Sequence, residues 1–188
     1  HDPKSRAWHR QSRIHPTLTI DGKDINTIGR ELLWQSSEDE DVLCVENQSY
    51  PNLLHRRTVW FCRKTGELPF FVIYDESNDD MPGDHELHFP MAPGKVRIDS
   101  ITRRIITGFD DANLLIQVEA KHPLSLIEEE GWTSQGYGHR ESRTSVTAVI
   151  KGRGPLTFVS IMVPYRGTKT PYCRLLTDPA TLVSGKNP

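Results

Sequence analysis

The chain has 188 residues, 36% of them hydrophobic and 26% charged, with a formal net charge of −2. This length suggests one domain with a real hydrophobic core. The near-neutral balance excludes a disordered chain and a nucleic-acid-binding footprint, and no run approaches the ~18 apolar residues of a membrane span. Residue 1 is His and no apolar signal segment follows it, so we expect an N-terminally truncated fragment of a longer protein.

Strand patterns begin early in the chain. Leu18 and Ile20 alternate with threonines, and Asp21-Gly22 then predicts a turn. The best helical candidate, residues 26–35, is interrupted by a glycine. We therefore interpret residues 32–34 as the return strand of a hairpin whose first strand ends at Ile20.

Strand-like runs with turn signals between them continue along the rest of the chain, over residues 41–50, 53–63, 68–77, 85–91, 95–101, 103–109, 113–120, 142–152 and 155–165. Residues 64–67 are a predicted hairpin loop. Such a series is typical of an all-β protein, an antiparallel β-sandwich or barrel. We expect residues 1–188 to form one domain, with 177–188 as a last edge element or a frayed tail.

The metal-binding residue types are sparse. Cys44, Cys62 and Cys173 form an odd set without CxxC spacing, which argues against a metal knuckle. All three lie in apolar, strand-like runs, so we expect buried free thiols, with a Cys44–Cys62 disulfide as the less favoured alternative. His85 and His88 fall on opposite faces of a straight strand and make a poor metal-binding pair.

The first fifteen residues gather basic and aromatic side chains. Arg10 and Arg13 lie near Trp8, with a single acidic residue to oppose them. Arginine forks suit carboxylate and sulfate groups, and Trp8 could stack on a sugar ring. The segment is either an anion site or a solvated chain end. His15 alone is more typical of a structural residue, although Pro16 biases it toward an extended conformation.

Residues 131–143 are a second candidate region. Three glycines surround Trp132, Tyr137, His139 and Arg140 in what we interpret as a loop between strands. Binding residues concentrate in loops on rigid β-scaffolds. Tyr137 could act as a general acid or base, and Arg140 could neutralise a carboxylate. The alternative is a long hairpin connection with ordinary turn glycines.

Two segments resemble the heparinase II/III-type polysaccharide lyases. Residues 8–25, WHRQSRIHPTLTIDGKDI, look like that family's segment W-x-R-x-[ST]-x-x-H-x-T-L-x-[IVL]-D-G. Residues 55–76, HRRTVWFCRKTGELPFFVIYDE, are similar to its R-x-V-x-F and F-x-V-x-D hairpin, and residues 131–142 and 154–165 match its closing strands more loosely. The likeness is closest to the heparinase III-like, heparan-sulfate-cleaving branch.

The resemblance implies a C-terminal antiparallel β-sandwich that follows an α/α toroid, with the toroid absent from this chain. Enzymes of this kind cleave uronic-acid-containing polysaccharides such as heparin and heparan sulfate by β-elimination. The implied partners are the acidic polysaccharide and the toroid, without nucleic acid, and the implied location is periplasmic or secreted. The fragment alone is expected to be inactive. A non-catalytic carbohydrate-binding or adhesion β-sandwich is the alternative function.

The resemblance also assigns individual positions. The catalytic Asn, Tyr and His of the family are expected upstream of this chain, so no catalytic residue is predicted within it. His15 matches a zinc ligand of metal-binding relatives, whose partner His and Asp are also expected upstream. The predicted substrate-binding residues are Trp8, Arg10, Arg13, Tyr137, His139 and Arg140.

Overall fold

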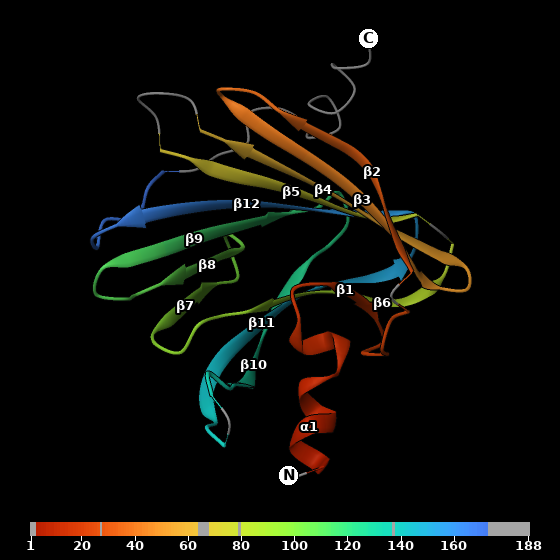
Figure 1. The fold of residues 1–188 in the computed structure, drawn as a ribbon, viewed down its shortest axis with the longest axis horizontal. Helices are drawn as coiled ribbons and strands as arrows, with labels where there is room; N and C mark the ends of the chain where they lie inside the picture. Colours follow the sequence, from red (N-terminus) through yellow and green to blue (C-terminus); the bar gives the residue numbers. More distant parts are fainter. Residues whose placement is uncertain (1–2, 27, 64–67, 79, 137, 173–188) are drawn as a thin grey trace.

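The protein is an antiparallel β-sandwich (Figure 1), one of the two architectures that the strand patterns predict and the one that the family resemblance implies. The computed structural model describes residues 3–26, 28–63, 68–78, 80–136 and 138–172. Two short helical segments, α1 (Pro3–His9) and η1 (Ser12–Ile14), precede the strands. None of the helices in this part of the chain has the length and apolarity that a membrane crossing requires.

The described strands form two sheets. The smaller sheet has the order β1-β6-β11-β10, with bounds β1 (Leu18–Ile20), β6 (Pro82–Pro90), β10 (Ser125–Thr133) and β11 (Glu141–Arg153). The larger sheet has the order β2-β3-β4-β5-β12-β9-β8-β7. Its bounds are β2 (Gly29–Ser36), β3 (Glu40–Tyr50), β4 (Leu53–Cys62), β5 (Phe70–Asn78), β7 (Val96–Asp99), β8 (Arg104–Thr107), β9 (Ala112–Glu119) and β12 (Leu156–Arg166).

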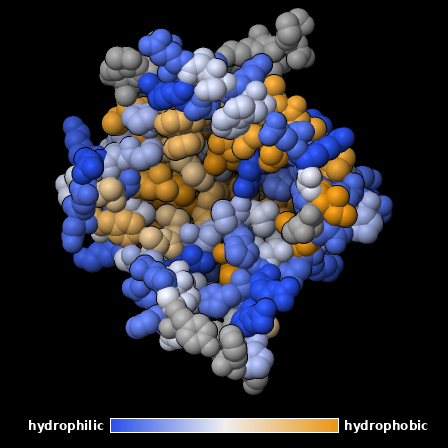
Figure 2. Space-filling view, viewed as in Figure 1, coloured by the Kyte–Doolittle hydropathy of each residue, from blue (hydrophilic) through white to orange (hydrophobic). Residues whose placement is uncertain are grey.

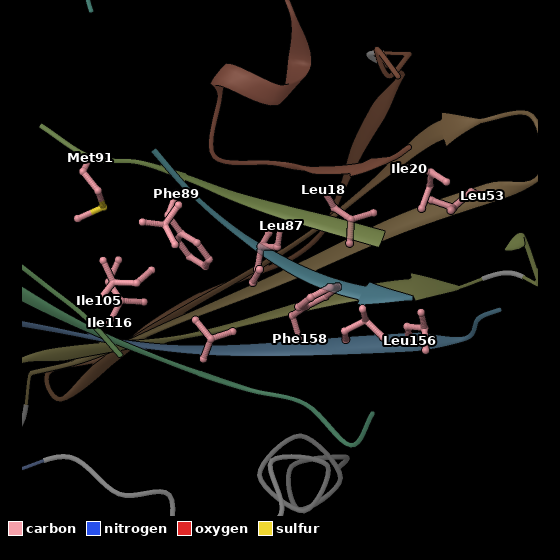
Figure 3. Close-up of a cluster of buried hydrophobic side chains, with 14 of the residues drawn as sticks. Leu18, Ile20, Leu53, Leu87, Phe89, Met91, Ile105, Ile116, Leu156 and Phe158 are labelled. Atoms are coloured by element: carbon pink, nitrogen blue, oxygen red, sulfur yellow. The ribbon is translucent and has the colours of Figure 1, made fainter. Parts of the chain in front are cut away.

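The core lies between the two sheets. Leu18 and Leu87 of the smaller sheet point toward Phe158 of the larger one (Figure 3), and each of the three is at most 1% exposed. Strand alternation explains this placement, because every second side chain of a strand faces the same layer. Burial of each such side chain stabilises the fold by about 1.5–3 kcal/mol, which holds the two layers together.

The predicted hairpin between Leu18–Ile20 and residues 32–34 is wrong. β1 pairs with β6, with Leu18 opposite Leu87, whereas residues 32–34 belong to β2 at the edge of the larger sheet, paired with β3. The turn itself is present, since Asp21 and Gly22 have φ values of 50° and 63°. Burial explains why β1 does not pair with β2. All three residues of β1 are buried, whereas every residue of β2 is exposed.

Three elements were not predicted. The helical patterns of α1 and η1 are too short to stand out, and β10 carries three consecutive glutamates, Glu128–Glu130, that hide its alternation. Because β10 runs to Thr133 and β11 begins at Glu141, the connection predicted over 131–143 shrinks to residues 134–140.

The cysteines do not pair as the alternative proposed. Cys44 and Cys62 are free thiols. They lie on neighbouring strands, but Cys44 is opposite Thr58 and Cys62 is opposite Glu40. Both are half-buried rather than fully buried. Cys173, the loop 64–67 and the tail 177–188 lie outside the described residues.

The surface is uneven in polarity. Figure 2 shows apolar side chains gathered at the centre of one face, with hydrophilic side chains around them. Edge strand β2 is also apolar in part: Trp34 is 59% exposed, and Ile28, just before the strand, is 72% exposed. An exposed, partly apolar edge of this kind can pair with or pack against another chain or domain.

Candidate functional site

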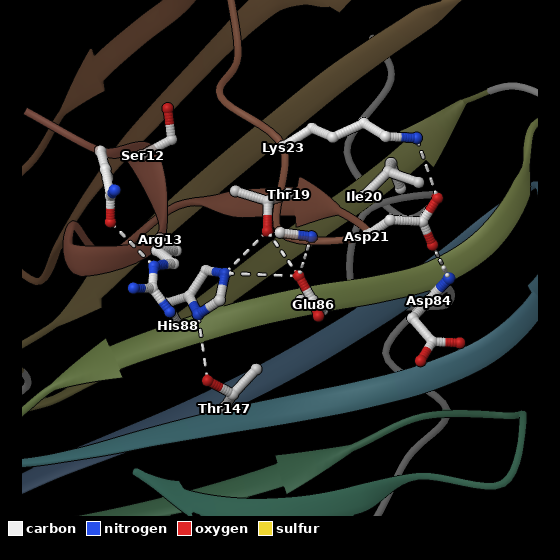
Figure 4. A network of polar contacts seen from close by, with 12 residues as sticks. Ser12, Arg13, Thr19, Ile20, Asp21, Lys23, Asp84, Glu86, His88 and Thr147 are labelled. Atoms are coloured by element: carbon white, nitrogen blue, oxygen red, sulfur yellow. Dashed lines mark hydrogen bonds and ion pairs between the residues drawn. The ribbon is translucent and has the colours of Figure 1, made fainter. Parts of the chain in front are cut away.

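A polar network occupies the outer face of the smaller sheet, away from the core (Figure 4). Thr19 Oγ1 donates a hydrogen bond to Glu86 Oε2 at 2.9 Å and lies 2.7 Å from His88 Nε2. His88 Nδ1 lies 3.0 Å from Thr147 Oγ1. Since the single hydrogen of the Thr19 hydroxyl goes to Glu86, His88 donates from Nε2 and accepts from Thr147 at Nδ1. The imidazole therefore links three strands, β1, β6 and β11.

His88 is buried although it faces away from the core. Its side chain is 3% exposed, and Figure 4 shows Arg13 of the N-terminal segment beside it. Burial and, to a smaller extent, the positive charge of Arg13 together lower the pKa of His88 from 6.5 to about 4. His88 is thus neutral near pH 7 and acts as a hydrogen-bonding bridge. His85 and His88 do not form a pair, as predicted. His85 contacts Ser77 and Met81, whereas His88 contacts Thr19 and Thr147.

The backbone around His15 is held on both sides. Arg143 Nη2 of β11 donates to the carbonyl oxygen of Ile14 at 3.1 Å, and Arg57 Nη1 of β4 donates to that of Pro16 at 2.6 Å. His15 has φ −109° and ψ 155°, the extended conformation that its following proline predicts. The His15 residue is exposed. The two sheets therefore fix the backbone of the Ile14–Pro16 segment, and the His15 side chain remains exposed.

A buried carboxylate holds Arg57 in place. Asp75 is 1% exposed, and its Oδ1 lies 2.6 Å from both Arg57 Nε and His55 Nε2. Burial by itself raises the pKa of Asp75, but the charge of Arg57 and the hydrogen bond from His55 outweigh it and lower the pKa below its usual 3.8. Asp75 therefore stays ionised at neutral pH and orients the guanidinium that bonds to Pro16.

The structure brings Trp8 and Arg13 together, next to Arg143. They line a small cavity of about 30 Å³ together with two glutamates of β10, Glu129 and Glu130. This volume accommodates about one water molecule rather than a sugar ring. Arg143 Nε is buried and has no hydrogen-bond partner among the described residues, so a water in this cavity would satisfy it.

The second candidate region is organised locally. Arg140 lies over the Trp132 ring, with 3.9 Å between Cζ and the ring centroid. The backbone N–H of His139 donates to Gly136 at 3.1 Å. His139 and Arg140 are exposed, and Tyr137 lies outside the described residues. The β10–β11 connection and α1 extend from the same end of the molecule (Figure 1), so the two predicted regions share one end.

The described residues do not by themselves form the implied zinc site. His15 offers one imidazole, and nowhere in the described ranges do three His, Cys, Asp or Glu side chains come together in a way that could hold a metal ion. Zinc needs three or four protein ligands. A metal at His15 would therefore require ligands from outside the described chain, and zinc binding stays a prediction.

Sequence reasoning missed Arg57, Asp75 and Arg143. One signal was available: Asp75 directly follows the apolar run 70–74 and has to be partnered if the strand is buried. Its partners on β4 could not be named without the register, which places Arg57 directly opposite Asp75.

The fold and the site together define the class of protein: a two-sheet antiparallel β-sandwich domain with a basic N-terminal segment fastened to one end. The family model for the heparinase II/III-like C-terminal domain matches residues 1–176. The chain belongs to this family, as its sequence resemblance implies.

Named relatives agree with this assignment. The chain is 35% identical to the heparin-sulfate lyase of Pedobacter heparinus over 173 residues, which cover 89% of this chain and 26% of that protein. A heparin-sulfate lyase of Bacteroides stercoris is 29% identical over 169 residues, with 88% and 25% coverage. The crystal structure of heparan sulfate lyase HepC from Pedobacter heparinus superposes with a TM-score of 0.82 at 35% identity, covering 90% of this chain and 27% of that one. The chain thus spans about a quarter of the length of the curated relatives.

Proposed function

We propose that this chain is the β-sandwich part of a polysaccharide lyase that cleaves a heparin- or heparan-sulfate-like glycosaminoglycan by β-elimination. Two relatives that cover most of the chain are named heparin-sulfate lyases. The observation that carries the proposal is the His15 segment, whose backbone is tied to both sheets while its side chain stays exposed. Such pre-organisation is typical of a group that serves a substrate.

β-Elimination removes the proton at C5 of a uronate, breaks the bond from C4 to the glycosidic oxygen, and leaves a double bond between C4 and C5. The departing oxygen takes up a proton from an acid. In this chain Arg10 and Arg13 are exposed cations that suit carboxylate and sulfate groups, and His15 lies beside them in sequence. The proton-transfer residues are proposed to come from the rest of the whole protein, with this chain binding and orienting the polymer.

The test uses the natural protein that contains this chain, incubated with heparan sulfate, heparin and chondroitin sulfate. We expect ultraviolet absorbance from unsaturated uronides with at least one of the first two, and none from the 188-residue chain alone. If the whole protein produces no such absorbance from any acidic glycan, the proposal is wrong.

His15 can be tested separately in the same protein. Replacement His15→Ala is expected to lower kcat by about 100-fold, since loss of a group that orients the substrate costs on this scale. The unfolding temperature should not change, because the side chain is exposed. His122→Ala is the matched control, an exposed histidine between β9 and β10. Unchanged activity of His15→Ala would show that the His15 side chain does not serve the substrate.

The two tryptophans, Trp8 and Trp132, give little support to the alternative function, a non-catalytic carbohydrate-binding module. Trp8 borders a cavity of one-water size, and Arg140 covers one face of Trp132. Neither ring is a fully open stacking platform. Tight binding of heparan sulfate by the 188-residue chain, combined with an inactive whole protein, would favour the alternative.

A further inference from the structure

The structure points to Arg57 and Arg143 as positioning residues of the proposed lyase: we propose that they act on the reaction through His15, without touching substrate. This inference rests on the proposed function. Each arginine binds a carbonyl next to His15, and they come from opposite layers, Arg57 from the larger sheet and Arg143 from the smaller one. The segment that they hold also contacts β6, because the backbone N–H of His88 donates to the carbonyl oxygen of Thr17 at 3.1 Å.

The Arg57 side chain binds two groups at once, and this fixes its orientation. Arg57 Nε binds Asp75 at 2.6 Å while Nη1 binds the Pro16 carbonyl, also at 2.6 Å. A planar guanidinium can make both contacts at once in fixed directions, and a lysine cannot. Because Asp75 is 1% exposed and also contacts His55, the guanidinium has little freedom to rotate. The Pro16 carbonyl group, which precedes β1, is thus held in a fixed position relative to β4.

A purely stabilising role predicts something different from a positioning role. If the contact between Arg57 and Pro16 only stabilises the fold, breaking it lowers the unfolding free energy to the same extent with either His or Ala at position 15. A positioning pair loses its effect on turnover once the side chain that it positions is gone. The comparison of single and double variants therefore separates the two roles.

The experiment measures kcat and KM of the whole protein for Arg57→Lys and Arg57→Gln, alone and combined with His15→Ala. We expect kcat to fall about tenfold or more for each Arg57 variant, with KM changed less than about threefold, since misplacement of a group that orients the substrate affects the transition state most. In the His15→Ala background, Arg57→Gln should lower kcat no further. Equal losses in both backgrounds would overturn the proposal.

Arg56→Gln is the matched control. Arg56 directly precedes Arg57 on β4 and also binds a buried carboxylate, but its partner is Glu46, at 2.8 Å, and not the His15 segment. Its kcat should stay unchanged.

Hydrogen exchange gives a readout that does not depend on lyase activity. Amides of residues 12–17 should exchange faster in Arg57→Gln than in wild type and not in Arg56→Gln. If exchange is faster in Arg57→Gln but the whole protein has no lyase activity, the proposed function is wrong, while Arg57 still holds the His15 segment. Unchanged exchange would overturn the fastening itself.

A second inference rests on a different feature, an open cleft of about 440 Å³ at the β7–β9 side of the larger sheet. Lys95 and Arg97 lie on its border and are exposed. The charge of Arg97 also helps to lower the pKa of Asp99. Tyr165 lies in the wall of the cleft and is 7% exposed, packed with Ile106 and Val163. We propose that this cleft binds an acidic saccharide unit, with the two cations on its charged groups.

The local structure supports a preformed cleft. Asn113 binds the carbonyl oxygens of Phe109 and Gly167, both at 3.0 Å, and its Oδ1 accepts from the N–H of Phe109 at 2.7 Å. These contacts fix the loop after β8 and the end of β12. Asp110 is the one acidic residue among the lining residues, so the border carries a net positive charge.

Sucrose octasulfate is a suitable probe, because it is a highly anionic saccharide without the uronate that β-elimination requires. Calorimetric titration of the whole protein should show that Lys95→Gln/Arg97→Gln weakens binding about tenfold, the scale of two charge-assisted contacts. Lys151→Gln/Arg153→Gln, which removes the same charge elsewhere, should weaken it less than about twofold. Equal weakening in both pairs, or no binding by wild type, would overturn the proposal.

Discussion

The two basic, aromatic regions that the sequence singles out are held in different ways. The N-terminal segment is tied to distant parts of the chain, since Arg57 and Arg143 bond to it from both sheets and His88 bonds to Thr17. The β10–β11 connection is held by neighbours in sequence, such as Ser134 Oγ, which donates to the Gly136 carbonyl at 2.8 Å.

The difference shows which region is pre-organised. Contacts between elements far apart in sequence are lost only when the layers separate, whereas local contacts form and break without disturbing the core. The N-terminal segment is therefore suited to hold a group in one position. The connection is suited to adapt to a ligand, and its residues Arg140 and His139 are exposed.

The largest expected effect comes from Asp75→Asn. Removing one partner of a buried ion pair costs about 3 kcal/mol of unfolding free energy, because Arg57 loses its charged partner. Urea denaturation of the chain should report this loss. Hydrogen exchange should rise at residues 12–17 and not at 134–140. Equal increases in both segments would contradict the comparison.

The second effect is a pH dependence of the fixed region. His88 has a folded pKa of about 4 and an ordinary value of 6.5, so the unfolded chain binds more protons between these values. Its contribution is fully present above pH 6.5 and is lost as the pH falls toward 4. Between pH 7.5 and 5, we expect wild type to lose about 2 kcal/mol through this group.

The pH effect is isolated by comparison with His88→Gln, which removes the titrating group. The variant should be less stable than wild type at pH 7.5, because its contacts to Thr19 and Thr147 are altered, and should depend less on pH. Denaturant titrations at the two pH values measure both quantities. An equal pH dependence in the two proteins would show that other groups are responsible.

The smallest effect concerns the β10–β11 connection. Arg140→Gln removes the cation above Trp132 at an exposed site, which costs about 0.5 kcal/mol. Thermal unfolding should shift little, and tryptophan fluorescence should report the changed surroundings of the ring. A loss as large as that of Asp75→Asn would mean that the connection is fixed as firmly as the N-terminal segment.

The sequence predicts the strands well where apolar and β-branched residues run together, as in Leu156–Arg166, and fails where charged residues mask the pattern, as in Glu128–Glu130. It identified His15 as a site candidate, and the structure gives it an extended, fixed backbone. It could not find Arg57, because adjacent arginines 56 and 57 look alike in sequence and only their opposite faces distinguish them.

The sequence by itself determined an antiparallel all-β chain and its family, because period-two alternation and a local motif are written in consecutive residues, and the family resemblance implied the sandwich. Only the tertiary structure decided that β1 pairs with β6 rather than with residues 32–34, and that Arg57 and Arg143 fasten the two sides of His15. The physical reason is that strand pairing and long-range hydrogen bonds depend on which faces are buried together. That choice is made by the whole core and by no single segment.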